Sequence, residues 1–133
     1  MSPDIPLPIT LTTASVLALF CLVLALRVSQ GRFKHRVAMG DGDNRDMTAR
    51  MRTHANFVEY VPIMLVLLGL LEMAKVDGRV LAGGAALLVV FRLMHAVGMP
   101  RPAPNVFRAI GALGTFALMM LQAIWGLYLV IAP

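Results

Sequence analysis

Several polar residues of the 133-residue sequence stand together in one short segment, 52–62, inside an otherwise apolar run. On a helix with about 100° per residue, Asn56 lies about 40° from Arg52, and Glu59 lies about 20° to the other side. Tyr60 lies at about 80° from Arg52 on the same face. A cation, an amide, a carboxylate and a phenol therefore form one polar stripe. Together they offer contacts to the carboxylates, amide backbone and amino group of a peptide-like zwitterion.

The composition indicates that this stripe belongs to a membrane protein. The chain is 59% hydrophobic and only 14% charged, with a mean hydropathy of +0.77, whereas ordinary soluble domains have roughly 45–50% apolar and about 25% charged residues. A water-soluble enzyme, a disordered chain and a disulfide scaffold all fit poorly, and Cys21, the only cysteine, cannot form an intrachain disulfide. The net charge of +5 does not indicate nucleic-acid binding, because the basic residues are not interleaved with stacking aromatics.

Four segments are long enough to cross a bilayer, since about twenty helical residues span a ~30 Å hydrocarbon layer. Their apolarity is continuous rather than alternating, which favours helices over a β-barrel. The sequence thus predicts an all-α integral membrane protein, a single domain over 1–133, with a four-helix bundle. The predicted helices are 9–29, 54–72, 79–99 and 106–132. The first lacks a basic leader and a small-residue cleavage site, so we interpret it as a retained helix.

Basic residues predict the orientation of these helices. Seven Lys or Arg residues lie in 27–52, and Arg101 and Arg108 add two more on the same side. The opposite side has only Lys75 and Arg79. The positive-inside rule then predicts cytoplasmic basic connections and two non-cytoplasmic termini, and the compact chain fits a bacterial inner membrane. Asn105 is the predicted N-cap of the last helix, which makes Arg108 its third residue.

The polar stripe has two interpretations. An ionisable group at membrane depth costs roughly 2.5–3.5 kcal/mol, so the stripe must face protein, water or a polar ligand. In the first interpretation it holds the bundle together, with Glu59 paired to Arg92 and Asn56 bonded across helices. In the second it binds the zwitterionic ligand. The residues alone leave both open.

The pattern Arg-x-x-x-Asn-x-x-Glu-Tyr-x-Pro from Arg52 to Pro62 resembles the second transmembrane helix of the MAPEG family (membrane-associated proteins in eicosanoid and glutathione metabolism). That family includes microsomal glutathione transferases and the leukotriene and prostaglandin synthases. The resemblance covers most of the chain, and the run from Phe91 to His95 resembles the family's third-helix segment. It implies a homotrimer that binds glutathione, as co-substrate, between adjacent subunits near the cytosolic face.

The resemblance also implies roles for individual residues. Arg108, thirteen residues after His95, falls at the position of the family's thiol-activating arginine. A first-helix arginine belongs to the site; we choose Arg27, with Arg32 as the alternative because loop lengths differ. The residues implied to hold glutathione are Arg27, Arg52, Asn56, Glu59, Tyr60 and His95.

The implied chemistry starts from a thiol with a pKa near 8.5, of which only a few per cent is thiolate at neutral pH. A guanidinium such as that of Arg108 stabilises the anion, and a downward shift of ~2 units corresponds to about 2.7 kcal/mol. The thiolate would add to lipophilic electrophiles or reduce lipid hydroperoxides from the bilayer. No His, Cys, Asp or Glu cluster has metal-ligand spacing, so we expect no metal site.

Three alternatives remain at this point. At the level of single residues, the alternative is that Arg108 is a lipid-phosphate anchor and His95 a plain interhelical hydrogen-bonder. At the level of the whole chain, the alternative is a non-catalytic member of the same fold that acts as a ligand binder or as an accessory subunit of a larger membrane complex. Met99 stands where many members have tyrosine and Ala109 where some have serine, which weakens the inference to eicosanoid chemistry. A small multidrug exporter fits less well, because those exporters place their acid in the first helix.

Overall fold

The computed structural model describes residues 5–132, and that range contains four helices and no strand. The helices are α1 (Pro8–His35), α2 (Arg45–Met73), α3 (Gly78–Gly98) and α4 (Val106–Ile131). Each is long and apolar enough to cross a membrane. The predicted all-helical architecture with four membrane-spanning segments is therefore confirmed.

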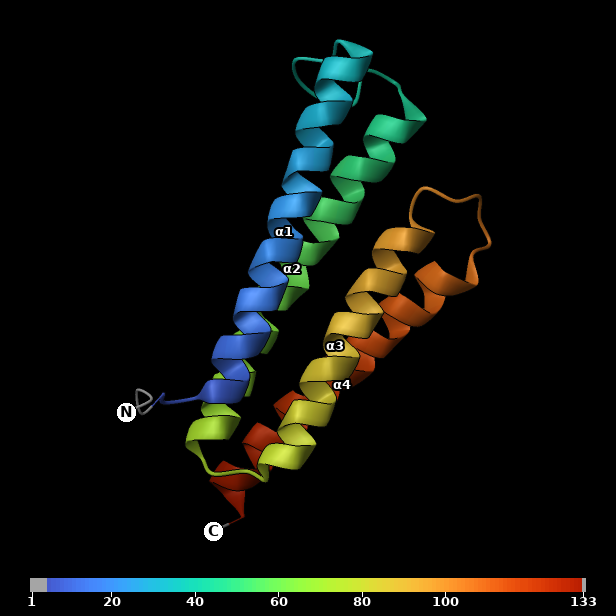
Figure 1. Cartoon of the computed structure of the whole chain (residues 1–133). Helices are drawn as coiled ribbons and strands as arrows, with labels where there is room; N and C mark the ends of the chain where they lie inside the picture. Colours follow the sequence, from blue (N-terminus) through green and yellow to red (C-terminus); the bar gives the residue numbers. More distant parts are fainter. Residues whose placement is uncertain (1–4, 133) are drawn as a thin grey trace.

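Two helices are longer than their predicted spans at the end that carries the basic connections. The first continues six residues past 29, to His35, and α2 begins at Arg45, nine residues before 54. Apolar runs mark only the part of a helix that lipid can cover, so hydropathy does not detect polar helical turns that project from the bilayer. These added turns form a hairpin that extends beyond the α3–α4 connection (Figure 1).

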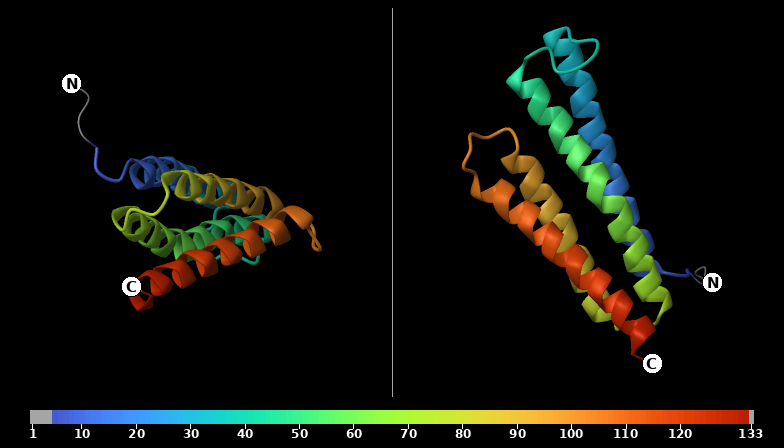
Figure 2. Two further views of the ribbon diagram at one scale, coloured as in Figure 1. Left: turned by 90° about the horizontal axis from the view of Figure 1, so that it is seen from below. Right: turned by 180° about the vertical axis from the view of Figure 1, so that it is seen from behind.

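The bundle is built from two antiparallel pairs, α1 with α2 and α3 with α4 (Figure 1). Seen from below and from behind, α3 lies beside α1, and α4 crosses α2 (Figure 2). Among the described residues α1 and α4 make no contact with each other. The start of α1 and the end of α4 lie at one end of the bundle, and the connections 36–44 and 99–105 lie at the other (Figure 1).

Asparagine and aspartate side chains begin three of the helices. The carboxamide oxygen of Asn44 accepts from the Met47 N–H at 3.0 Å, and Asp77 accepts from the first N–H groups of α3. Asn105 accepts from the Arg108 N–H at 3.1 Å, so the predicted cap and the position of Arg108 in the first turn of α4 are confirmed. Such caps satisfy N–H groups that have no partner within the helix.

The first helix is capped from another helix. Leu7 precedes α1 in a left-handed conformation and offers no side-chain cap, and Pro8 fills a first-turn position. The carboxylate of Glu72, at the end of α2, instead accepts from the N–H groups of Ile9 and Thr10 at 2.9 and 2.8 Å. It also accepts from the Thr10 hydroxyl at 2.6 Å. An anion at a helix N-terminus is favoured by the helix dipole.

The apolar core lies mainly between the first three helices. One cluster fills the half nearer the basic connections and a second fills the half nearer the termini. Their buried members are Leu17, Leu24, Phe57, Val61, Met64, Leu88 and Ala96 in the first, and Leu68, Leu71, Leu81 and Ala85 in the second. In α4, by contrast, only Gly111 and Thr115 are buried. Most of α4 is thus open on the single chain.

Helices α3 and α4 approach closely because glycine occupies their contact points. A Cβ added to Gly98 would stand 2.3 Å from the Arg108 backbone nitrogen, and one added to Gly111 would stand 2.5 Å from the His95 nitrogen. Neither position admits a side chain without moving backbone. This close contact holds the start of α4, and Arg108 with it, against the end of α3.

Candidate functional site

Arg92 and Asn56 join α3 to α2 inside the bundle. Arg92 is 2% exposed, and its Nη1 donates to the side-chain oxygen of Asn56 at 2.9 Å. Its Nη2 donates to the Gly111 carbonyl of α4 at 3.4 Å. The interpretation that Asn56 bonds across helices is therefore confirmed. The interpretation that Arg92 pairs with Glu59 is wrong, because its guanidinium is directed to Asn56 and Gly111.

Glu59 is exposed on the surface of the chain, although it lies within a membrane-crossing helix. All three ion pairs among residues 5–132 involve Asp46 instead, and no hydrogen bond in that range involves the Glu59 carboxylate. Its neighbour Tyr60 is half-buried and packs edge-on against Phe116 of α4, with ring centroids 5.1 Å apart. The carboxylate thus faces outward beside the contact of α2 with α4.

Arg52 and Arg108 line one cleft. This cleft has a volume of about 520 Å³ and lies between the start of α2, the 99–105 connection and the start of α4. Both arginines are exposed, and Arg101 lines the same space while its guanidinium lies 4.9 Å from the Phe107 ring centroid. Met99 is also in the lining. Several guanidinium groups around one opening make it a site for an anion.

His95 lies behind this cleft rather than in its wall. It is 5% exposed, and its backbone packs closely against Gly111 of α4. Met99, one turn further on at the end of α3, does line the cleft. The buried side chain of His95 does not. His95 therefore supports the α3–α4 contact from inside.

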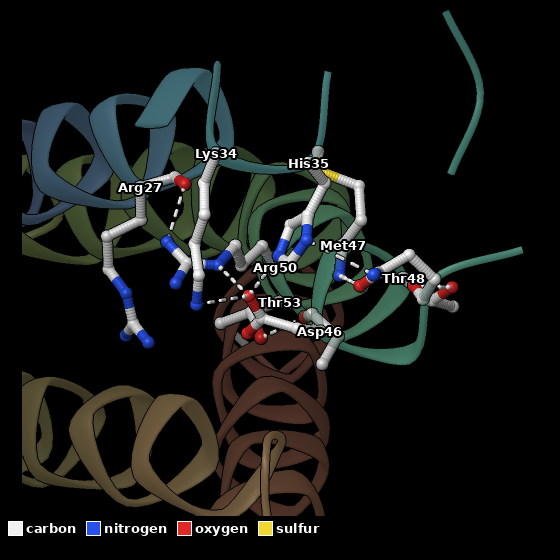
Figure 3. Close-up of polar contacts among 10 residues, drawn as sticks. Arg27, Lys34, His35, Asp46, Met47, Thr48, Arg50 and Thr53 are labelled. Carbon is white, nitrogen blue, oxygen red and sulfur yellow. Dashed lines mark hydrogen bonds and ion pairs between the residues drawn. The ribbon is translucent and has the colours of Figure 1, made fainter. Parts of the chain in front are cut away.

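The two candidate arginines of α1 differ in what they bind. The Arg32 Nη1 donates to the carbonyls of Ala38 and Gly40 at 3.3 and 3.2 Å and so closes the 36–44 connection. Arg27 offers its backbone carbonyl to Arg50 at 2.9 Å, while its guanidinium points away from that bond (Figure 3). The Arg27 side chain lines a small cavity with Arg50 and Pro100. Of these two arginines, the Arg32 guanidinium is engaged by the described part of the chain and that of Arg27 is not.

A polar network fastens the hairpin between α1 and α2 and was not predicted from the sequence. Asp46 accepts from Arg50 Nε at 3.1 Å and lies 2.9 Å from His35 Nε2, with Lys34 at 4.0 Å (Figure 3). The Asp46–Arg50 pair has the i,i+4 spacing that a sequence reveals. The His35 contact joins α1 to α2 and depends on the tertiary fold. This network positions the start of α2. It thereby also positions Arg52, which lies six residues after Asp46.

The connection before α2 is ordered by Asp41. Its carboxylate accepts from the Thr48 hydroxyl at 2.8 Å and from the Asp43 N–H at 3.1 Å. The Thr48 hydroxyl, followed by the Asp43 N–H, holds the pKa of Asp41 below its usual range. Asp43 and Thr48 both line the cleft, so this turn forms part of its rim.

Taken one by one, the predicted residues occupy three neighbouring places. Arg52 and Arg108 share the cleft, Asn56 and Tyr60 lie deeper along the same face of α2, and Glu59 faces outward. Arg27 lies at the small cavity. The alanine at position 49 lines both openings and links them across α2. A single chain therefore presents a cationic rim with an unpaired carboxylate below it.

Comparison with known proteins identifies relatives of this sequence and its family. The sequence is 35% identical to the inner membrane protein YecN of Escherichia coli K12 over 81 residues, or 61% of this chain and 62% of YecN. YecN of Escherichia coli O6:H1 matches to the same extent. The alignment thus spans about three fifths of these relatives' length. No solved structure matches significantly. The family model for the MAPEG family matches residues 10–128, nearly all of the four helices, and the chain is therefore an integral membrane protein that belongs to the MAPEG family.

Proposed function

We propose that this protein is a glutathione-dependent membrane enzyme. It uses the glutathione thiolate to attack lipophilic electrophiles or to reduce lipid hydroperoxides. The working form is a homotrimer with glutathione bound between protomers, as the MAPEG resemblance implies. The basic connections face the cytoplasm and both termini lie on the other side, consistent with the positive-inside rule. A bacterial inner membrane suits a chain whose relatives are named inner membrane proteins.

The observation that carries this proposal is the exposed, unpaired carboxylate of Glu59 in the middle of a spanning helix. Lipid cannot solvate a carboxylate, and we infer that a cation from a ligand or a neighbouring chain lies against it. The α-ammonium of glutathione is such a cation. The exposed surface of α4 beside Glu59 supports assembly, because it is largely open on the single chain.

The polar groups match the groups of glutathione one for one. Glutathione has two carboxylates and a thiolate, for which the cations are Arg27, Arg52 and Arg108. Its ammonium has an anion in Glu59. Asn56 binds an amide or carboxylate oxygen. The cleft at Arg52 and Arg108, about 520 Å³, falls within the roughly 300–1,000 Å³ of small-molecule sites. Donor types and room both fit the tripeptide.

Arg108 is the catalytic residue of this proposal. Its guanidinium stays protonated and stabilises the glutathione thiolate, and its place in the first turn of α4 adds the positive end of the helix dipole. The thiol proton passes to water. With a chlorinated aromatic substrate a carbon–sulfur bond forms and chloride leaves with its electron pair. With a hydroperoxide, two glutathiones are oxidised to the disulfide while the hydroperoxide becomes an alcohol and water.

Glutathione binding and conjugation by the purified protein test this function. We expect Arg108→Ala to lower turnover about 100-fold with little change in affinity, because a ~2-unit pKa shift of the thiol is worth about 2.7 kcal/mol. We expect Glu59→Gln to weaken binding about 10- to 100-fold, since a charge-assisted hydrogen bond contributes roughly 1.5–3 kcal/mol. Arg79→Ala, at the opposite end of the bundle, is the control and should behave as wild type.

The outcomes separate the enzyme from its alternatives. Saturable glutathione binding without conjugation or peroxidase activity across a substrate panel would identify a non-catalytic binder. Wild-type behaviour of both Arg108→Ala and Glu59→Gln would show that the site lies elsewhere. A cross-linking series that stops at the monomer would remove the trimer from the proposal.

A further inference from the structure

The orientation of the Asn56 amide follows from the chemistry of its neighbour. A guanidinium carries only hydrogen-bond donors, so the amide atom that faces Arg92 at 2.9 Å must be the oxygen. The NH2 group of Asn56 is then the free end of the amide, and none of the residues in 5–132 accepts a hydrogen bond from it. Asn56 is half-buried, so this end of the stripe remains open to another molecule.

Arg92 is held firmly enough to impose that orientation. Its guanidinium donates to α2 through Asn56 and to α4 through the Gly111 carbonyl, and its side chain is fully enclosed. The Gly111 carbonyl also accepts from the Thr115 hydroxyl at 2.7 Å, which fixes that acceptor in turn. A rigid, doubly anchored donor leaves the amide one favourable rotamer.

We propose that Arg92 is a positioning residue that turns the Asn56 amide so that its NH2 group binds the ligand as a hydrogen-bond donor. The group recognised is therefore an acceptor, a carboxylate or peptide carbonyl oxygen of the tripeptide. This inference rests on the proposed function, because it specifies how one contact of the glutathione site works. Arg92 acts through Asn56 and does not itself touch the ligand.

The substitution Asn56→Asp separates positioning from mere packing. Aspartate keeps an oxygen toward Arg92 and strengthens that contact as an ion pair, but it replaces the outward NH2 by a second acceptor. We expect the melting temperature to equal or exceed that of wild type, while glutathione affinity measured by titration calorimetry falls at least tenfold. Gln30→Glu adds the same charge on an exposed part of α1 and should leave affinity unchanged. Asn56→Leu removes both functions of the amide and should lower the melting temperature.

Arg92→Lys provides a kinetic readout. Lysine keeps a cation and a donor but lacks the planar fork, so the amide is held less firmly. We expect KM for glutathione to rise severalfold while kcat stays within twofold of wild type. A parallel fall of kcat without a KM change would contradict a positioning role.

Each result decides between the two proposals. An Asn56→Asp protein that binds glutathione within twofold of wild type overturns the donor assignment alone. An Asn56→Asp melting temperature as low as that of Asn56→Leu also overturns it, because oxygen would then not face Arg92. Wild-type protein that binds no glutathione overturns this inference together with the proposed function.

Discussion

Replacing Glu72 by alanine should unfasten the start of the first helix. The Glu72 carboxylate accepts three hydrogen bonds from α1, at 2.9, 2.8 and 2.6 Å, across 62 or 63 residues of sequence. Alanine leaves the Ile9 and Thr10 N–H groups without that partner, and no capping side chain at Leu7 replaces it. The perturbation is confined to the end of the bundle where α1 begins and α2 ends, far from the proposed site.

The size of the effect follows from the bonds lost. An N-cap side chain contributes about 0.5–2 kcal/mol, and a hydrogen bond to a charged group about 1.5–3 kcal/mol. The three bonds share one partly exposed carboxylate and are not additive, so we expect a loss of about 2 kcal/mol. That is a roughly 30-fold change in the folding equilibrium.

Equilibrium unfolding in mixed detergent and SDS micelles measures this loss. Glu72→Gln keeps one acceptor oxygen and should lose about half as much, and Thr10→Val removes only the 2.6 Å hydroxyl bond and should lose about 1 kcal/mol. Lys75→Gln alters an exposed charge three residues away and should stay within about 0.5 kcal/mol of wild type.

A Glu72→Ala protein as stable as Lys75→Gln would contradict the cap on α1. A greater loss of stability in Thr10→Val than in Glu72→Ala would contradict it as well, because the hydroxyl is only one of the carboxylate's three donors.

Two further predictions concern packing and pH. Gly98→Ala should destabilise the protein by about 1–3 kcal/mol in the same unfolding assay, because its Cβ would meet Arg108 backbone at 2.3 Å; Gly83→Ala, with no atom within 4 Å, should not, and equal stability of the two variants would contradict the α3–α4 contact. Asp41, whose pKa is lowered by Thr48, contributes stability that is present above its ordinary pKa and is lost as pH falls through the lowered value. Asp41→Asn should flatten the acid side of the stability–pH curve, and an unchanged curve would contradict the Asp41–Thr48 contact.

Features that depend on local sequence could be predicted. The continuous apolar runs predicted four helices, and the residue type at Asn105 predicted where the last of them begins, because caps depend on neighbours within one turn. Helical periodicity alone placed the stripe of Arg52, Asn56 and Glu59 on one face. The basic connections also gave the shared end of the two loops.

Features that depend on contacts between distant segments could not be predicted. Arg92 could reach either Glu59 or Asn56 as far as charge and spacing could tell, and only the helix packing selects Asn56. The cap that Glu72 gives to α1 joins residues more than sixty positions apart. The polar hairpin turns lack apolar periodicity, so their helical conformation depends on the Asp46 network. The bonds of Arg32 to the 36–44 connection likewise depend on the path of that connection, and the choice of Arg27 for the site stays a prediction.

Formation of the glutathione thiolate on the protein is the most direct test of the central claim. Purified wild-type protein is titrated with glutathione near neutral pH while the thiolate absorbance in the ultraviolet is followed. We predict a saturable thiolate signal that is absent in Arg108→Ala, although that variant still binds glutathione by calorimetry. A wild-type titration without thiolate, or an undiminished signal in Arg108→Ala, would contradict the account.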